Sequence, residues 1–210
     1  MNKADPIRKK RDIRKIALYC LNKGQRRNYL LIVLGIATAL RVSDLLSLTW
    51  EQVYDFAGKR FRSHLAVKES KTGKERLIAL NRDAKEALKT CFAGGRAHSG
   101  NYLFPGGRSK EKPLSRSQAW RIIKDTALYL NIAGRICPHS LRKTLGYHAW
   151  RAQKSPVLIM DVYNHSSYEV TKRYLAIDQD DRDNLYKGMD FLRAGRERER
   201  GRGKDKKASD

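Results

Sequence analysis

Apolar side chains recur at helical spacing along most of the chain. The pattern predicts helices over residues 9–22 and 26–40, and the second is buried because residues 30–40 form a nearly continuous apolar run. Ser115 followed by Gln118 is a capping box that opens a helix ending near Leu130. Pro138 suits the first turn of another helix. The remaining predicted helices are a short one from Ser43, one over 81–92, one over 138–152, two shorter ones after it, and one over 178–192.

Residues 51–80 depart from the helical period. The segments 62–68 and 76–80 read as strands, and Ser70-Lys71-Thr72-Gly73 joins them as the tip of a hairpin, with the glycine suited to the turn. Glycine-containing loops at 93–95 and 105–107 separate later elements, and no internal repeat is visible. The predicted fold class is therefore mainly α with one small antiparallel β-sheet (α+β).

The charge balance indicates a polyanionic partner. Lys and Arg number 45 against 22 Asp and Glu in 210 residues, a net charge of +23, while 40% apolar residues exclude a wholly disordered chain. We interpret residues 1–24 as a basic segment with the first helix, 25–192 as the folded domain, and 193–210 as a disordered basic tail. Both ends fit either contact with a nucleic-acid backbone or a solubilising role.

Several classes of protein are excluded on the sequence. The apolar run at 30–40 is shorter than the roughly 20 residues of a membrane helix, and no secretory signal opens the chain. Cys20, Cys91 and Cys137 are scattered, with neither a disulfide pattern nor a metal-ligand spacing. A reduced protein of the cytoplasm, without a bound metal, is the expectation.

Polar residues at four places are candidates for chemistry. Arg41 follows the buried run, with Asp44 close enough to orient it. His139 and Arg142 share one face at the start of a predicted helix, an arrangement suited to a phosphate. Each pattern alone also fits an ordinary structural role, such as an arginine extending from a helix end to solvent.

His165 and Tyr174 would point to opposite faces of one straight helix. Ser166 and Glu169 form a second apparent capping box, which places a helix start, and hence a bend, between them. Both side chains could then reach one site. An isolated tyrosine on a helix is otherwise most simply part of the core.

Order and spacing together change this interpretation. Arg41, Lys71, His139, Arg142, His165 and Tyr174 stand in the order of the active-site residues of the tyrosine recombinases, or phage-type integrases, and the chain resembles that family over about residues 25–192. Four segments carry the resemblance: ATALRVSDLLSLTW (37–50), SKTGKERLIAL (70–80), PHSLRKTLGYH (138–148) and NHSSYEVTKRYL (164–175).

The resemblance implies a recombinase catalytic-domain fold and a role for each of these residues. Tyr174 would attack a DNA phosphodiester and form a 3′-phosphotyrosine. The other roles would be phosphate binding by Arg41 and Arg142, protonation of the leaving 5′-oxygen by Lys71, acid–base catalysis by His139, a phosphate hydrogen bond from His165, and support from Asp44. The physical chemistry agrees, because a phenol with a pKa near 10 needs activation and two guanidiniums stabilise a pentacoordinate transition state. No cofactor is expected, since the covalent bond conserves the energy for rejoining.

The sequence departs from the family pattern in three ways. Tyr163-Asn164 replaces the usual Leu-Gly pair before the second histidine, and asparagine tolerates the left-handed backbone of that turn. Lys143 stands where many relatives carry histidine. Only about 24 residues precede the first long buried helix, so the chain resembles a catalytic domain alone, as in short fimbrial-switch inverters.

The expected partner is double-stranded DNA, bound in the nucleoid. The backbone contacts expected nearest the site are Lys74, Arg76, Lys143 and Arg173. Self-association into dimers or tetramers and accessory DNA-binding proteins are also expected, and residues 178–192 either pass to a neighbouring protomer or pack in cis. The preferred function is site-specific integration, excision or inversion of DNA. The alternatives are a catalytically idle DNA-binding relative, a type IB topoisomerase-like enzyme, and a basic RNA-binding protein, which would leave the ordered motifs unexplained.

Overall fold

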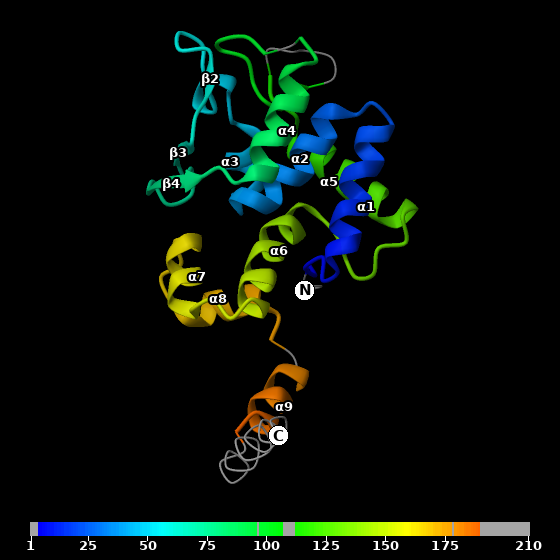
Figure 1. Cartoon of the computed structure of the whole chain (residues 1–210), viewed down its shortest axis with the longest axis vertical. Helices are drawn as coiled ribbons and strands as arrows, with labels where there is room; N and C mark the ends of the chain where they lie inside the picture. Colours follow the sequence, from blue (N-terminus) through cyan, green and yellow to red (C-terminus); the bar gives the residue numbers. More distant parts are fainter. Residues whose placement is uncertain (1–3, 96, 107–111, 178, 190–210) are drawn as a thin grey trace, which may run out of the picture. The chain divides into compact units, whose positions relative to one another are not determined.

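The computed structural model describes residues 4–95, 97–106, 112–177 and 179–189, and the chain divides into a compact unit, Met1–Ala176, and a C-terminal unit, Ile177–Asp210 (Figure 1). The C-terminal unit contains helix α9 (Gln179–Lys187), which lies within the helix predicted over 178–192. The predicted tail, 193–210, lies outside the described residues.

The compact unit is built around helix α2 (Arg26–Thr38), which packs against α1 (Lys10–Asn22), α4 (Arg82–Phe92) and α6 (Pro138–Arg151) (Figure 1). Its continuous apolar run explains this central position, because a helix that is apolar on several faces is buried on several faces. Gly35 permits the approach of α6, since a Cβ atom there would lie 2.6 Å from Cδ1 of Leu141. The burial predicted for this helix is confirmed by Leu30, Leu31, Ile32 and Leu34, all fully buried.

The N-terminal segment is part of the same core. Ile7 and Ile16 are buried, and the backbone N–H of Ile7 donates to Oγ1 of Thr144 on α6 (2.9 Å). Asp5 bonds to Arg135 through its backbone N–H and its carboxylate (3.1 and 2.8 Å). Residues 4–22 therefore help to hold α6, the helix that carries two of the residues predicted as catalytic.

The predicted hairpin is present, and the predicted single sheet is replaced by two small ones. Strands β3 (His64–Lys68) and β4 (Glu75–Ala79) pair antiparallel with Leu65 opposite Ile78. Strands β1 (Tyr54–Asp55) and β2 (Arg60–Phe61) form a second pair, preceded by the 3₁₀ turn η1 (Trp50–Gln52). Two-residue strands show no alternation, which is why the apolar pattern did not reveal them.

The remaining helices follow the predicted order. They are α3 (Val42–Leu46), α5 (Arg116–Tyr129), α7 (Pro156–Tyr163) and α8 (Tyr168–Leu175). The Ser115–Gln118 capping box is present in both directions (3.2 and 3.1 Å). The prediction of a capping box formed by Ser166 and Glu169 was wrong, because α8 begins at Tyr168 with Ser167 as its N-cap residue and without a side-chain cap. No helix of the described residues is both long and apolar enough to cross a membrane.

Candidate active site

Tyr174 lies half-buried on α8, among side chains from α6 and from the turn between α7 and α8. Its ring centroid is 4.7 Å from the His165 ring and 5.2 Å from the His139 ring. Cζ of Arg142 lies 5.6 Å from the same centroid. Four of the six residues predicted as catalytic are thus brought into one cluster.

The α7–α8 turn makes this convergence possible. Asn164 ends α7 in the left-handed conformation (φ 57°), as its residue type allowed. The chain then changes direction before α8, so that the rings of His165 and Tyr174 meet although the two residues are nine positions apart. Nδ1 of His165 contacts the buried Thr171 hydroxyl at 3.0 Å, which fixes the imidazole ring against α8.

Arg142 is almost completely buried under the cluster. Its Nη1 donates to the carbonyl of Ala39 and its Nη2 to the carbonyl of Tyr163 (3.0 Å). Among the described residues its Nε has no partner. Burial lowers the pKa of the Arg142 guanidinium, and the electrostatic interactions with the phenols of Tyr174 and Tyr163 oppose that lowering.

Arg41 precedes α3 and is held from the hairpin. Its Nη1 donates to Oε2 of Glu69 at 2.5 Å, and Glu69 is fully buried. The same carboxylate accepts bonds from Oγ1 of Thr72 (2.9 Å) and Nη1 of Arg76 (3.3 Å). Arg41, with 25% of its side chain exposed, is therefore tied to the strand end that leads to Lys71.

Asp44 makes no bond to Arg41, contrary to the expectation from the sequence. One carboxylate oxygen, Oδ1, accepts bonds from the backbone N–H (3.1 Å) and hydroxyl (2.5 Å) of Ser70, and the other has no partner within the described residues. Asp44 thus anchors the hairpin tip to α3. The carboxylate beside Arg41 comes from Glu69, which is 28 positions away in the sequence and was beyond the reach of local spacing.

Two of the four predicted DNA contacts are structural residues. The Arg76 side chain is only 8% exposed and binds Glu69 and the carbonyl of Thr38 (3.3 Å). Lys143 is buried on α6, and its Nζ donates to the carbonyl of Ala4 (2.9 Å). Neither can contact a DNA backbone in this arrangement. Lys74 and Arg173 are exposed.

Lys71 is exposed at the hairpin tip, and no hydrogen bond or ion pair of its side chain occurs within the described part of the chain. The tip itself is ordered by bonds from Glu69 N–H to the Lys74 carbonyl (2.9 Å) and from Gly73 N–H to the Glu69 carbonyl (2.8 Å). The lysine thus extends from a defined turn toward solvent, where it is available to a bound substrate.

The pKa values of both site histidines are lowered, which favours the neutral imidazole at pH 7. Burial, followed by the charges of Lys143, Arg142 and Arg41, lowers the pKa of His139. Burial, followed chiefly by Arg142 and Arg41, lowers the pKa of His165 to about 4. The site therefore combines two guanidiniums with two imidazoles whose neutral form is favoured. A neutral imidazole can accept a proton and become cationic, or donate its ring N–H to a hydrogen bond.

Sequence reasoning missed two residues of the site. Glu69 continues the inward-facing series of Leu65 and Val67 on β3, so strict alternation could have placed its carboxylate inside. Tyr163 had been noted only as a departure from the family pattern, yet its ring stacks on His165 (5.1 Å, 18°) and lies 5.0 Å from that of Tyr174.

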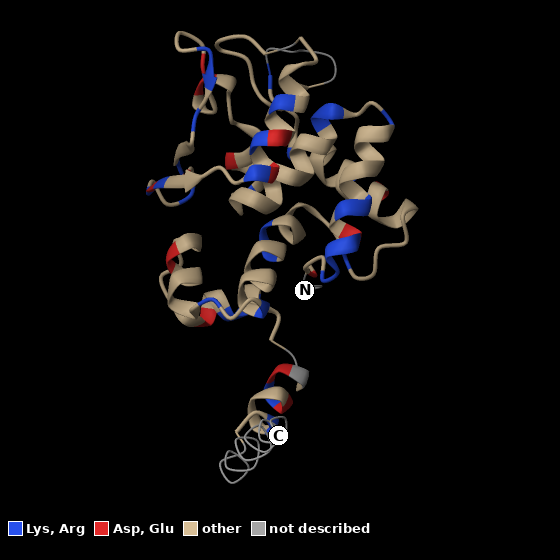
Figure 2. Ribbon diagram, viewed as in Figure 1, with Lys and Arg blue, Asp and Glu red and all other residues tan. Residues whose placement is uncertain are grey.

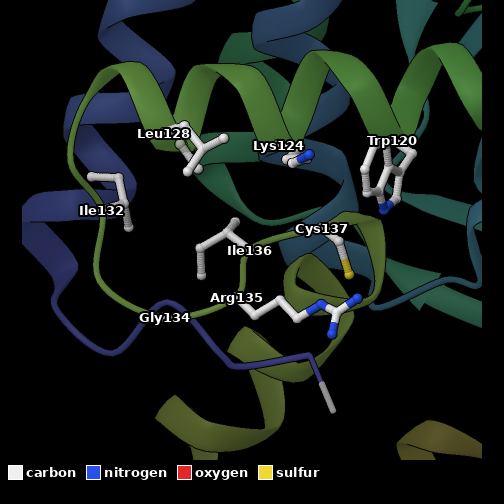
Figure 3. Close-up of a pocket in the computed structure, with 9 residues that line it drawn as sticks. Trp120, Lys124, Leu128, Ile132, Gly134, Arg135, Ile136 and Cys137 are labelled. Carbon is white, nitrogen blue, oxygen red and sulfur yellow. The ribbon is translucent and has the colours of Figure 1, made fainter. Parts of the chain in front are cut away.

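A cavity of about 420 Å³ lies between α5 and the loop before α6 (Figure 3). Trp120 and Lys124 line it from the helix and Ile136 and Cys137 from the loop. None of the residues predicted as catalytic is among its lining residues. The described residues also contain no cluster of His, Cys, Asp or Glu that could hold a metal ion.

Several known proteins have a sequence similar to that of this chain. Over 187 residues the chain is 37% identical to the probable integrase/recombinase YoeC of Bacillus subtilis (strain 168), a match covering 89% of this chain and 97% of YoeC. It is 27% identical over 161 residues to the type 1 fimbriae regulatory protein FimE of Escherichia coli (strain K12), covering 75% and 78%. Identity to the tyrosine recombinase XerD of Halalkalibacterium halodurans is 29%, but the match spans only 48% of XerD.

Solved structures share the fold. The crystal structure of XerA recombinase matches with a TM-score of 0.69 at 20% identity, covering 86% of this chain and 61% of XerA. XerH bound to a palindromic difH substrate in a post-cleavage complex matches with a TM-score of 0.70 at 16% identity, covering 90% and 53%. The profile of the phage integrase family matches residues 9–181, which include every predicted catalytic residue, and the chain therefore belongs to the phage integrase family.

Proposed function

We propose that this protein is a site-specific DNA recombinase that cuts and rejoins DNA through a covalent 3′-phosphotyrosine. The convergence of Tyr174 with His139, His165 and Arg142 carries the proposal. This cluster combines a nucleophile, neutral bases and a buried cation, which are the groups that phosphoryl transfer to a phenol requires. The relatives named as recombinases and integrases support the same conclusion.

Each site residue has its own role in the proposed reaction. Oη of Tyr174 attacks phosphorus and its proton passes to the neutral His139, while the bond from phosphorus to the 5′-oxygen breaks. Lys71 gives a proton to that leaving oxygen. Arg41 and Arg142 bind the non-bridging oxygens, whose charge increases in the transition state. Because one phosphoester replaces another, the reverse attack by a 5′-hydroxyl rejoins DNA without a nucleotide.

The hydrogen bonding of His165 suits a further phosphate contact. The Thr171 hydroxyl lies 3.0 Å from Nδ1. When this hydroxyl donates to Nδ1 rather than to the more distant Ser167 carbonyl (3.4 Å), the ring proton resides on Nε2 and can be donated to a phosphate oxygen. The lowered pKa of His165 keeps the ring neutral in the free protein, and a bound phosphate, being anionic, would act against that lowering.

Double-stranded DNA is the proposed partner. Lys and Arg lie on α1, α2, α4 and α6 and along the β3–β4 hairpin (Figure 2). Lys74, three positions after Lys71, and Arg173, next to Tyr174 in the sequence, are exposed and are the proposed backbone contacts. Affinity should then fall steeply with salt through counterion release. Self-association on DNA and accessory DNA-binding proteins remain part of the proposal, as does action at the nucleoid.

A covalent-adduct assay tests the function. Supercoiled plasmid carrying the DNA that flanks the gene is incubated with protein, without added metal, and quenched in detergent. Wild type should yield protein joined to DNA, and Tyr174→Phe should yield none while binding DNA as wild type does. Tyr168→Phe is the matched control, because Tyr168 is an exposed tyrosine on the same helix.

The outcomes separate the candidate functions. Adducts with recombined plasmid support a recombinase, whereas adducts with relaxed plasmid alone indicate a topoisomerase-like enzyme. Adducts that survive Tyr174→Phe contradict the assignment of the nucleophile. Salt-dependent binding without any adduct on the flanking DNA favours the idle DNA-binding alternative.

A further inference from the structure

Tyr163 occupies the centre of the site without being one of the residues that the chemistry requires. It is the last residue of α7 and is fully buried. Its ring stacks on His165, lies 5.0 Å from the Tyr174 ring, and carries the Arg142 guanidinium over its face at 4.7 Å. One side chain thus contacts three of the proposed catalytic groups.

The Tyr163 hydroxyl is inserted into helix α6 directly beneath Arg142. It donates to the backbone carbonyl of Arg142 (2.5 Å) and accepts from the backbone N–H of Gly146 (2.7 Å). These two backbone groups are four residues apart, so in a regular α-helix they would bond to each other. The phenol therefore bridges the carbonyl and the N–H of one i to i+4 pair in α6. The carbonyl of this pair belongs to Arg142, whose side chain faces the site.

Residues 146 and 163 are sterically matched. A Cβ atom on Gly146 would lie 2.9 Å from the Tyr163 hydroxyl and 3.2 Å from Cε2 of its ring. Backbone and ring are therefore in contact with no room for a methyl group. A leucine at 163 would have neither the ring face for Arg142 nor the hydroxyl for α6.

Arg142 is held twice by this one residue. The Tyr163 carbonyl accepts from Nη2 at 3.0 Å, and the Tyr163 ring covers the guanidinium. A flat cation held at its face and at its edge keeps a single orientation, and stacking of this kind is favourable for a desolvated arginine. Any residue at position 163 could provide the carbonyl that binds Arg142. The contributions specific to tyrosine are therefore the ring over the guanidinium and the hydroxyl bonded to α6.

We propose that Tyr163 is a positioning residue for DNA strand cleavage, which fixes the Arg142 guanidinium, and with it the His165 imidazole, against the scissile phosphate. The inference rests on the proposed function and deepens it. Correct placement is a large part of catalysis of this type, since a displacement of about 1 Å can reduce a rate about a hundredfold. Tyr163 itself does not need to touch the substrate.

Tyr163→Phe tests the hydroxyl while keeping the ring. We expect the first-order rate of adduct formation at saturating plasmid to fall about tenfold or more, with the dissociation constant for DNA within about twofold of wild type, because the exposed DNA contacts are untouched. Tyr147→Phe is the matched control: Tyr147 is on α6 and 8% exposed, and no hydrogen bond of its hydroxyl occurs in the described structure. Its rate should match that of wild type.

A double-mutant cycle separates positioning from general loosening of the fold. If Tyr163 acts through Arg142, the loss caused by Tyr163→Phe should shrink to less than about threefold in an Arg142→Lys background, where no planar guanidinium remains to be oriented. An equal loss in both backgrounds, or a Tyr163→Phe variant as fast as wild type, overturns the inference. Absence of adduct with wild type contradicts the proposed function instead, so the two failures are distinguishable.

A second variant covers the case in which Tyr163→Phe does not fold. Tyr163→Leu with Gly146→Ala removes the ring and the hydroxyl and places a methyl group in the space that they leave. This variant should fold and bind DNA but cleave at least about tenfold more slowly. Cleavage at the wild-type rate would show that Arg142 needs no tyrosine beneath it.

Discussion

Replacement of Glu69 by alanine would leave two guanidiniums around an empty carboxylate site. Glu69 is fully buried, and its two oxygens bind Arg41 (2.5 Å) and Arg76 (3.3 Å). Removal of one partner of a buried ion pair costs about 3–5 kcal/mol, chiefly because the other charge stays buried without compensation. Arg41 is 25% exposed and can turn to water, whereas Arg76, at 8%, cannot.

We therefore expect the lower end of that range, a loss of about 3 kcal/mol in the free energy of unfolding. For a chain of this size the loss corresponds to a decrease of about 6–12 °C in melting temperature. Urea denaturation followed by circular dichroism measures the free energy directly. Glu86→Ala is the matched control, since Glu86 forms an ion pair with Lys89 at 3.0 Å but both side chains are more than half exposed.

The double variant Glu69→Ala with Arg76→Met tests the physical reason. Methionine removes the uncompensated charge and keeps much of the volume, so about 1 kcal/mol or more should be regained. If Glu69→Ala is no more destabilising than Glu86→Ala, the buried carboxylate does not hold the two arginines, and our account of how Arg41 is fixed to the hairpin is wrong.

Two further predictions concern the lysine and the histidines. Lys71→Ala should slow adduct formation about a hundredfold or more without changing the melting temperature, because its side chain has no bond in the described structure; a lower melting temperature would indicate a structural role instead. The pKa of His139 is lowered, and that of His165 lowered to about 4, chiefly by burial. An unfolded histidine titrates near 6.5, so the unfolded chain binds more protons below that pH, and the free energy of unfolding should fall from about pH 6.5 to 4. Urea denaturation at pH 7.5, 6 and 5 measures this, and the decrease should be smaller in His165→Asn; an equal decrease would contradict the shift.

Local patterns predicted the helices, whereas the residues of the candidate site were named from their order and spacing through the family resemblance. The period of apolar residues placed α1, α2, α4 and α6 within a few residues of their observed bounds. The change of direction between α7 and α8 was also expected, although for an incorrect reason. The left-handed conformation of Asn164 and the extended backbone of Ser167 produce it, not a capping box at Ser166. Both features are local, since they depend on residues adjacent in sequence.

Long-range partners could not be predicted. Composition marks Arg76 and Lys143 as cations but does not show whether they face solvent, and their buried partners, Glu69 and the Ala4 carbonyl, belong to other segments. The carboxylate nearest to Arg41 in sequence, Asp44, is committed to Ser70. Pairing between charges is decided by tertiary packing, which spacing along the chain does not describe.

The short helix α8 belongs to the same compact unit as the rest of the site. Thr171 and Leu175, on either side of Tyr174 in sequence, are buried in that unit, and the division of the chain falls only after Ala176. Within one chain, the proposed nucleophile therefore lies beside Arg142, which would bind its phosphate. If copies gather on one DNA as we propose, each copy can place Tyr174 against a phosphate together with its own Arg142, so the nucleophile and a phosphate-binding group come from the same chain.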